Sequence, residues 1–162
     1  MMKRSHFLIG AAAGALAADV LDESLVLGVL VAGLAALLPD ADHPGSVTGQ
    51  LLPGWWHRLT PGHRGPTHSL AWCGLLAGLA YAIQGLFSAG PVGPVVAVLI
   101  GVGALSHVAA DGLTTQGVPL WWPFRRRKVV LLGGLAFRTH SWPEVLVTLT
   151  VVSGAAWLVV RS

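Results

Sequence analysis

The stretch V-G-P-V-V-A-V-L-I-G-V-G-A-L-S-H-V-A-A-D, residues 92–111, decides the fold. It carries no Asp, Glu, Lys or Arg before its final aspartate, and its apolar part approaches the roughly 20 residues that a helix needs to cross a bilayer. His107 and Asp111 stand at its end, four residues apart, so a helix presents both side chains on one face. The pattern predicts a membrane helix that ends in a polar site at one membrane face.

Further apolar runs on both sides predict an all-α fold, a polytopic membrane helical bundle of about five short helices. The five runs end at polar, glycine or proline residues and cover 7–20, 25–38, 70–87, 92–110 and 145–160. The first two, at about 14 residues each, are shorter than a straight span, so we expect them to be tilted, extended by polar turns or shielded by neighbours. The first run follows Lys3 and Arg4 as in a signal peptide, but cleavage would discard His6, and we interpret it as a retained helix.

Composition supports a membrane protein. Hydrophobic residues make up 54% of the 162 residues and charged residues 10%, against roughly 25% charged in soluble domains. The mean hydropathy is +0.69. We expect a single domain over residues 1–162, with a soluble buried helical bundle as the alternative. The net charge of +3 does not point to nucleic acid, because the basic residues lie between apolar runs, where membrane topology explains them.

Five crossings would place the N-terminus and both long polar segments, 39–69 and 112–143, on one side of the membrane. That side would hold every lysine and arginine except Arg161. The positive-inside rule makes it the cytoplasmic side. The predicted location is the bacterial or archaeal cytoplasmic (inner) membrane, with the N-terminus in the cytoplasm and the C-terminus outside.

Five crossings also put every histidine on the cytoplasmic side, together with Asp40, Asp42 and Asp111. Ionisable groups at membrane depth are costly and are functional by default. Because Cys73 is the only cysteine, an internal disulfide and a thiolate cage are both excluded, and a metal must be held by imidazole and carboxylate. Such ligands suit Zn, Mn, Mg or Fe.

Three segments supply these ligands. His107 and Asp111 could share an ion, or pair only to stabilise their helix. In L-L-P-D-A-D-H-P, residues 37–44, Pro39 and Pro44 break the helix, and Asp40 and Asp42 are either ligands or a helix stop.

In G-H-R-G-P-T-H-S, residues 62–69, Thr67 can cap the next helix. His68 is the better ligand candidate here, and His63 is either a ligand or part of a capping loop. Arg64 beside a helix start forms an anion cradle. His6 stands at a helix start on the same face. We expect His43, His57 and His140 to be solvated.

These motifs resemble a known family. S-H-F-L-I-G-A, L-P-D-A-D-H-P, H-R-G-P-T-H-S and S-H-V-A-A-D-G-L-T-T-Q-G-V-P-L-W-W-P-F, within residues 5–124, are similar to the bacterial YdjM-like family of inner-membrane metal-dependent hydrolases, one member of which is described as LexA-binding. The resemblance implies a hydrolase without naming its substrate. A remoter similarity to zinc-dependent phospholipase C and P1 nuclease enzymes, through an early His and an H-x-x-x-D pair, would imply phosphoester chemistry at zinc.

The sequence therefore predicts a membrane-embedded metal-dependent hydrolase that acts at the cytoplasmic face on a lipid-borne phosphoester or ester. Asp40 or Asp42 would take the proton of metal-activated water, and Arg64 or Arg138 would neutralise substrate charge. Tryptophans at 55, 56, 121 and 122 are placed like an interfacial belt against membrane lipids. The metal, zinc or else manganese or magnesium, would be held by a subset of His6, Asp40, Asp42, His63, His68, His107 and Asp111.

Two alternatives remain. A regulator or scaffold would use a closed, structural metal site and bind a cytoplasmic protein partner through the basic loop 125–128. A transporter would also carry polar residues in its helices, although here they gather at one face and not at the midplane. Neither H-E-x-x-H nor G-x-S-x-G occurs in the sequence, which argues against zincin-like proteases and serine hydrolases.

Overall fold

The computed structural model describes residues 1–60, 62–87 and 92–162, and the regular structure in them is helical. The all-α prediction is confirmed, because each apolar run forms a long helix. These helices are α1 (Lys3–Val20), α2 (Leu25–Ala35), α4 (Leu70–Phe87), α5 (Val92–Gly112) and α6 (Trp142–Arg161). One short helix, α3 (Gly54–Leu59), was not predicted, because it has six residues and lies within a polar segment. The predicted turn at 88–91 lies outside the described residues.

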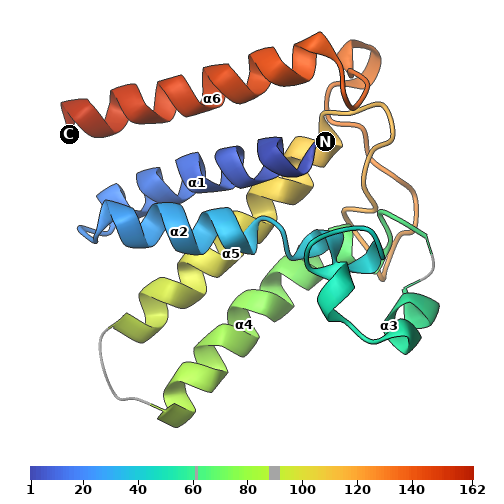
Figure 1. The fold of residues 1–162 in the computed structure, drawn as a ribbon, viewed down its shortest axis with the longest axis horizontal. Helices are drawn as coiled ribbons and strands as arrows, with labels where there is room; N and C mark the ends of the chain where they lie inside the picture. The colour runs from blue at the N-terminus through green and yellow to red at the C-terminus, as the bar shows by residue number, and fades with distance from the viewer. Residues whose placement is uncertain (61, 88–91) are drawn as a thin grey trace.

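Helix α1 lies at the centre of the bundle. It contacts α2, α5 and α6, and α5 in turn contacts α2 and α4. Figure 1 shows α6, α1 and α2 running side by side, with α5 and α4 crossing behind and below them. Helix α1 therefore connects the outlying α6 to the rest of the molecule.

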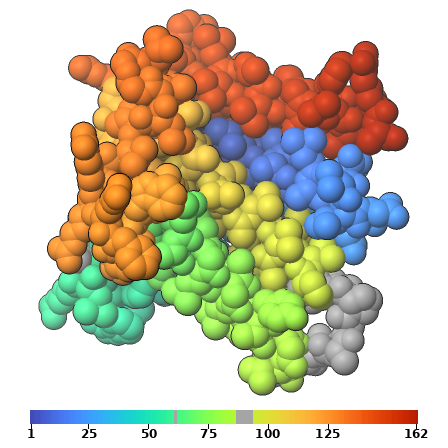
Figure 2. Space-filling model, turned by 180° about the vertical axis from the view of Figure 1, so that it is seen from behind, coloured from blue at the N-terminus to red at the C-terminus, as the bar shows by residue number. Residues whose placement is uncertain are grey.

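The polar segments gather at one end of the bundle. Figure 1 shows the starts of α1 and α6 and the end of α5 at the end where α2 leads into the connecting loops, while the C-terminus lies at the opposite end. Seen from behind in Figure 2, the segment 113–141 and the segment around α3 cover that same end. The segments that carry the candidate ligands therefore lie at one end of the bundle, as alternating membrane crossings predict.

Glycines allow α1 and α2 to touch through their backbones. A Cβ added to Gly14 would lie 2.1 Å from the carbonyl oxygen of Gly28, and one added to Gly28 would lie 2.3 Å from that of Gly14. Helix α5 meets α2 in the same way, since a Cβ on Gly103 would lie 2.3 Å from the carbonyl oxygen of Ala32. Small residues are the usual means by which membrane helices pack closely.

Three stretches have the length and apolar composition to cross a membrane: Leu25–Asp42, Pro94–Gly112 and Trp142–Arg161. The apolar stretch Leu70–Leu86 is shorter. Helix α1 is long enough but carries Lys3, Arg4 and Asp19. The prediction of five crossings thus rests on α1 and α4 as well as on these three, and it stays a prediction.

The segment between α5 and α6 forms a surface hairpin. Val118 and Val129 exchange backbone hydrogen bonds of 3.0 and 2.8 Å, and Thr114 forms a second isolated bridge with Phe137. The basic run Arg125–Lys128 lies in the turn between the paired valines. The basic run is therefore presented at the turn of a hairpin.

The close approach of α1 and α2 generates the first prediction. Replacing Gly14 by alanine forces the two backbones apart, and we expect a loss of about 1–3 kcal/mol in unfolding free energy, the usual effect of overpacking. The Gly78→Ala change on α4 is the matched control, because nothing lies within 4 Å of its added Cβ. Thermal unfolding in detergent measures both, and equal melting temperatures would contradict the packing described.

Candidate metal centre

Two tight turns position the aspartates of the L-P-D-A-D-H-P motif. Pro39 starts the 3-10 turn Pro39–Asp42, in which both aspartates are buried. Ser46 Oγ donates to the carbonyl oxygen of Asp40 at 2.6 Å, and Trp56 Nε1 of α3 donates to that of Ala41 at 3.0 Å. The unpredicted helix α3 therefore fixes the aspartate turn from outside.

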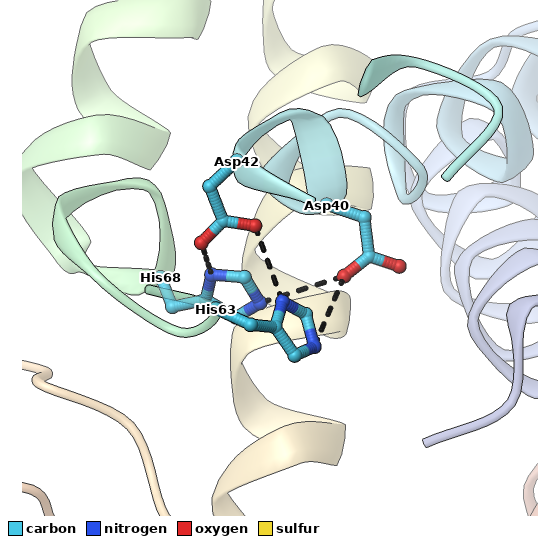
Figure 3. A group of neighbouring side chains, drawn as sticks. All are labelled: Asp40, Asp42, His63 and His68. Carbon is cyan, nitrogen blue, oxygen red and sulfur yellow. Dashed lines mark hydrogen bonds and ion pairs between the residues drawn. The ribbon is translucent and has the colours of Figure 1, made fainter. Parts of the chain in front are cut away.

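Asp42 binds the outer nitrogens of two histidines. Its Oδ1 lies 3.2 Å from His63 Nδ1, and its Oδ2 lies 3.4 Å from His68 Nδ1. Thr67 Oγ1 and the Gly65 backbone nitrogen donate to Oδ2 at 2.9 and 3.3 Å. In Figure 3 the Asp42 carboxylate faces both rings from one side, and dashed lines join it to both imidazoles. This is the position of a carboxylate that orients histidine ligands.

Four other ligand atoms face one another at the centre. His68 Nε2 lies 3.2 Å from His107 Nε2, and each of these nitrogens lies 3.6 Å from Asp40 Oδ1. Asp111 Oδ2 lies 3.5 Å from the first nitrogen and 3.7 Å from the second. The atoms come from the aspartate turn, the start of α4 and the end of α5.

The orientation of His107 is set by a neighbouring helix. Its Nδ1 donates to the carbonyl oxygen of Ala36, the C-cap of α2, at 2.6 Å. Because a carbonyl only accepts, this bond leaves the lone pair of Nε2 facing the centre. The ring of His6 stacks on that of His107, with 3.6 Å between centroids, and His6 Nε2 lies 3.3 Å from Asp111 Oδ1.

The two oxygens of Asp111 have different surroundings. Oδ1 accepts a 2.8 Å hydrogen bond from Arg64 Nη2 and also contacts His6 and the Met1 nitrogen. Oδ2 is buried and, among the described residues, accepts no hydrogen bond, although His68 Nε2 and His107 Nε2 lie 3.5 and 3.7 Å from it. A buried acceptor without a partner costs about 1–3 kcal/mol, and more for a charged group. A cation among the four central atoms would satisfy it.

Arg64 differs from the expected free anion cradle. Its backbone adopts a left-handed conformation, with φ of 61°, which is strained for a residue other than glycine. The guanidinium is buried and donates to Thr114 Oγ1 at 2.6 Å as well as to Asp111. Arg64 thus holds Asp111 in place, and its predicted role toward substrate stays a prediction.

Negative charge is concentrated around His68. Burial alone would lower its pKa, but the neighbouring carboxylates of Asp111, Asp40 and Asp42 outweigh that effect and raise the pKa to about 10. A proton on His68 therefore balances part of the acidic cluster when no ion is bound. A divalent cation would replace this proton and neutralise more of the charge.

The structure brings all seven predicted ligands into two adjacent groups. One group contains Asp40, Asp42, His63 and His68, and the other contains His6, His107 and Asp111. His63 is the most exposed of the seven, with 38% of its side chain accessible. Imidazole nitrogen and carboxylate oxygen without thiolate fit zinc or manganese.

The other histidines lie outside these groups, although the ring of His43 contacts that of His63 edge-on, with 5.1 Å between centroids. His43 Nδ1 accepts from the Gly45 backbone nitrogen at 3.1 Å, and the ring of His57 contacts backbone carbonyl oxygens of Asp42 and Gly49. His140 lies at the start of α6, where its backbone nitrogen donates to Glu144 at 2.7 Å.

Two residues near the site were missed by the sequence interpretation. Thr67 was assigned only a capping role, but its hydroxyl binds Asp42. Glu144 is fully buried and accepts from the backbone nitrogens of Met2 and His140, which ties the start of α6 to the start of α1. A carboxylate directly after Pro143, at the head of an apolar run, was the available signal.

A helical membrane protein with a buried histidine and aspartate cluster at one end of its bundle is the class that the fold and site define. Within that class the chain belongs to the YdjM inner membrane protein family, whose model matches residues 1–161. The family places the protein in the bacterial inner membrane.

Two curated relatives share 44% identity with the chain over 99 residues: inner membrane protein YdjM of Escherichia coli (strain K12) and that of Shigella flexneri. Each alignment covers 58% of this chain and 48% of the relative, so the chain spans about half the length of the curated relatives it matches. No solved structure shows significant similarity to it.

The central atoms generate the second prediction. We expect His107→Ala and Asp111→Asn to remove most of the bound metal, because each loses an atom that faces the centre. Cys73→Ala, which changes a buried side chain of α4 outside both groups, is the control. Mass spectrometry of the purified proteins measures their metal content. If both site variants keep as much metal as the original protein, His107 and Asp111 are not metal ligands.

Proposed function

We propose that this chain is a membrane-embedded metal-dependent hydrolase that cleaves a phosphoester at the cytoplasmic face. The observation that carries the proposal is the convergence of His68, His107, Asp40 and Asp111 around the unpartnered Asp111 Oδ2. A buried carboxylate oxygen that accepts no hydrogen bond is rare in folded proteins, and a bound ion would account for it.

The spacing of the four atoms fits one tetrahedral ion. Zinc with ligands at about 2.0–2.1 Å separates neighbouring ligand atoms by about 3.3–3.4 Å. The five separations that involve His68 Nε2 or His107 Nε2, out of six among these atoms, run from 3.2 to 3.7 Å. His6, which is stacked on His107 and close to Asp111 Oδ1, is the candidate for an additional ligand.

A divalent ion held there would supply Lewis acidity and lower the pKa of bound water toward 7. The chain supplies a proton acceptor in His63. Its Nδ1 is bound to Asp42 Oδ1 at 3.2 Å, while its Nε2 lies 3.9 Å from Asp40 Oδ1. With Asp42 holding Nδ1–H, the lone pair of Nε2 is free to accept a proton from attacking water. Asp42 is then a positioning residue that acts through His63 and His68.

The surroundings of this centre favour an anionic substrate. A cavity of about 590 Å³ adjoins it and is lined by Lys3, Arg4, Asp40, His63 and other polar residues. Two exposed cations at its edge suit a phosphate group, whose charge must be neutralised during hydrolysis.

The competing function is a structural metal site in a regulator. Burial favours it, since His6, His68, His107 and Asp111 are almost completely inaccessible. Catalytic sites keep an open position, whereas four protein ligands would complete a tetrahedral ion, so hydrolysis requires water to replace Asp40, the ligand that also lines the cavity, or to add as a fifth ligand. Hydrolysis assays on metal-replete protein separate the two functions.

The third prediction concerns activity. Chelation should abolish hydrolysis of lipid phosphates by the purified protein, and zinc or manganese should restore it. His63→Ala should retain its metal yet lower kcat about 10²–10⁴-fold, the usual contribution of a general base. Arg126→Gln is the control, because Arg126 lies outside both ligand groups and does not line the cavity.

Three outcomes would count against this assignment. Activity that persists under chelation would exclude the metal mechanism. Metal loss in His63→Ala would make His63 a ligand and not the base. Metal-replete protein that hydrolyses no phosphoester or ester would favour the regulatory function.

The fourth prediction concerns orientation. Because the candidate centre lies at the end that carries the basic residues, a reporter inserted in the 125–128 turn should be cytoplasmic. A reporter after Ser162 should be outside if the number of crossings is odd. If both reporters lie on the same side, the number of crossings is even and the predicted five is wrong. If the turn reporter lies outside the cytoplasm, the proposed activity belongs to the other face of the membrane.

A further inference from the structure

Two hollows meet at the start of α1. The cavity beside Asp40 and His63 includes Lys3 and Arg4 in its lining. The same two residues line a second hollow of about 350 Å³, whose other walls are the apolar side chains of Phe7, Leu8 and Leu37. Lys3 and Arg4 therefore stand at the boundary between a polar space at the candidate centre and an apolar groove.

The apolar groove lies between α1 and α2, which run side by side in Figure 1. Phe7 and Leu8 lie one turn into α1, and Leu37 follows the end of α2. The apolar surface continues beyond the groove, because Leu34 and Leu30 on α2 are exposed. In a membrane this surface faces lipid, so the groove opens toward the acyl chains of the bilayer.

The two cations at the boundary differ in how they are held. Lys3 Nζ donates to the Gly45 carbonyl oxygen at 2.7 Å, which fixes it over the loop beside the aspartate turn. Arg4 is exposed, and within the described residues no side-chain hydrogen bond or ion pair holds its guanidinium. A free guanidinium beside an apolar groove is complementary to a phosphate that carries an apolar chain.

We propose that the substrate is a lipid phosphate whose phosphate lies in the cavity against Lys3 and Arg4 and whose chain lies between α1 and α2 over Phe7, Leu8 and Leu37. The inference rests on the proposed hydrolase function and names its substrate class. Water adds its oxygen to phosphorus as the bond from phosphorus to the lipid oxygen breaks. One proton of the water passes to His63, which later releases it to solvent. The lipid oxygen takes a proton from solvent and leaves as an alcohol, and inorganic phosphate is the other product.

Binding is tested separately from hydrolysis with dodecylphosphonate, which has no cleavable ester bond. Leu8→Trp fills the groove, and we expect it to weaken dodecylphosphonate binding at least tenfold in detergent, as measured by titration calorimetry. Methylphosphonate, which has no long chain, should bind Leu8→Trp and the original protein equally. Leu37→Trp fills the groove from α2 and should repeat the result.

The matched control is Leu149→Trp on α6, an exposed leucine away from the groove. It should leave the binding of both phosphonates unchanged, because Leu149 is away from the groove. Partition of dodecylphosphonate into detergent is the same for every variant and therefore cannot produce a difference between them. Arg4→Gln should weaken both phosphonates about tenfold, whereas Arg126→Gln, in the distant hairpin turn, should weaken neither.

The outcomes distinguish this inference from the proposed function. Equal dodecylphosphonate affinity in Leu8→Trp, Leu37→Trp and the original protein would overturn the groove. If Arg4→Gln and the original protein bind the phosphonates with equal affinity, the phosphate does not lie against Arg4. Groove-dependent binding without hydrolysis of any lipid phosphate would support the binding site and refute the hydrolase. If the protein hydrolyses aryl phosphates and the groove variants change neither binding nor hydrolysis, the hydrolase is supported and the lipid-binding groove is refuted.

Discussion

The backbone contact between α1 and α2 is the constraint on which the site depends. Gly14 and Gly28 let these helices touch, and Gly103 lets α5 reach α2 equally closely. His6 precedes Gly10 by about one helical turn, and His107 follows Gly103 by the same interval. The helix contacts therefore bring the two imidazoles into the 3.6 Å stack at the end of the bundle. Bulky residues at these glycines would separate the rings.

Charge is concentrated at the assembled site. Asp40, Asp42 and Asp111 each lie within 3.4–3.6 Å of His68, and Arg64 and the Met1 amine contact Asp111. Carboxylates are costly to bury in a membrane protein, which is why such a cluster indicates function better than stability. The same carboxylates raise the pKa of His68 to about 10.

Sequence predicted the long helices and the residues of the cluster, because apolar runs and clustered ionisable groups are local signals. It did not predict how the ligands are arranged. Asp40 and Asp42 are two residues apart and looked equivalent, but the 3-10 turn directs one to the central atoms and the other to the outer nitrogens of His63 and His68. Arg64 likewise appeared free, because its ion pair with Asp111 joins segments 47 residues apart. Contacts of this kind leave no pattern in a single sequence.

The bond between His107 Nδ1 and the Ala36 carbonyl oxygen links the site to the end of α2. Helix α2 has only 11 residues, and a bilayer thicker than a short helix thins around it and pulls on its ends. Any such adjustment moves the carbonyl that orients the imidazole. The thickness of the surrounding membrane is thereby mechanically coupled to the geometry of the metal-binding atoms.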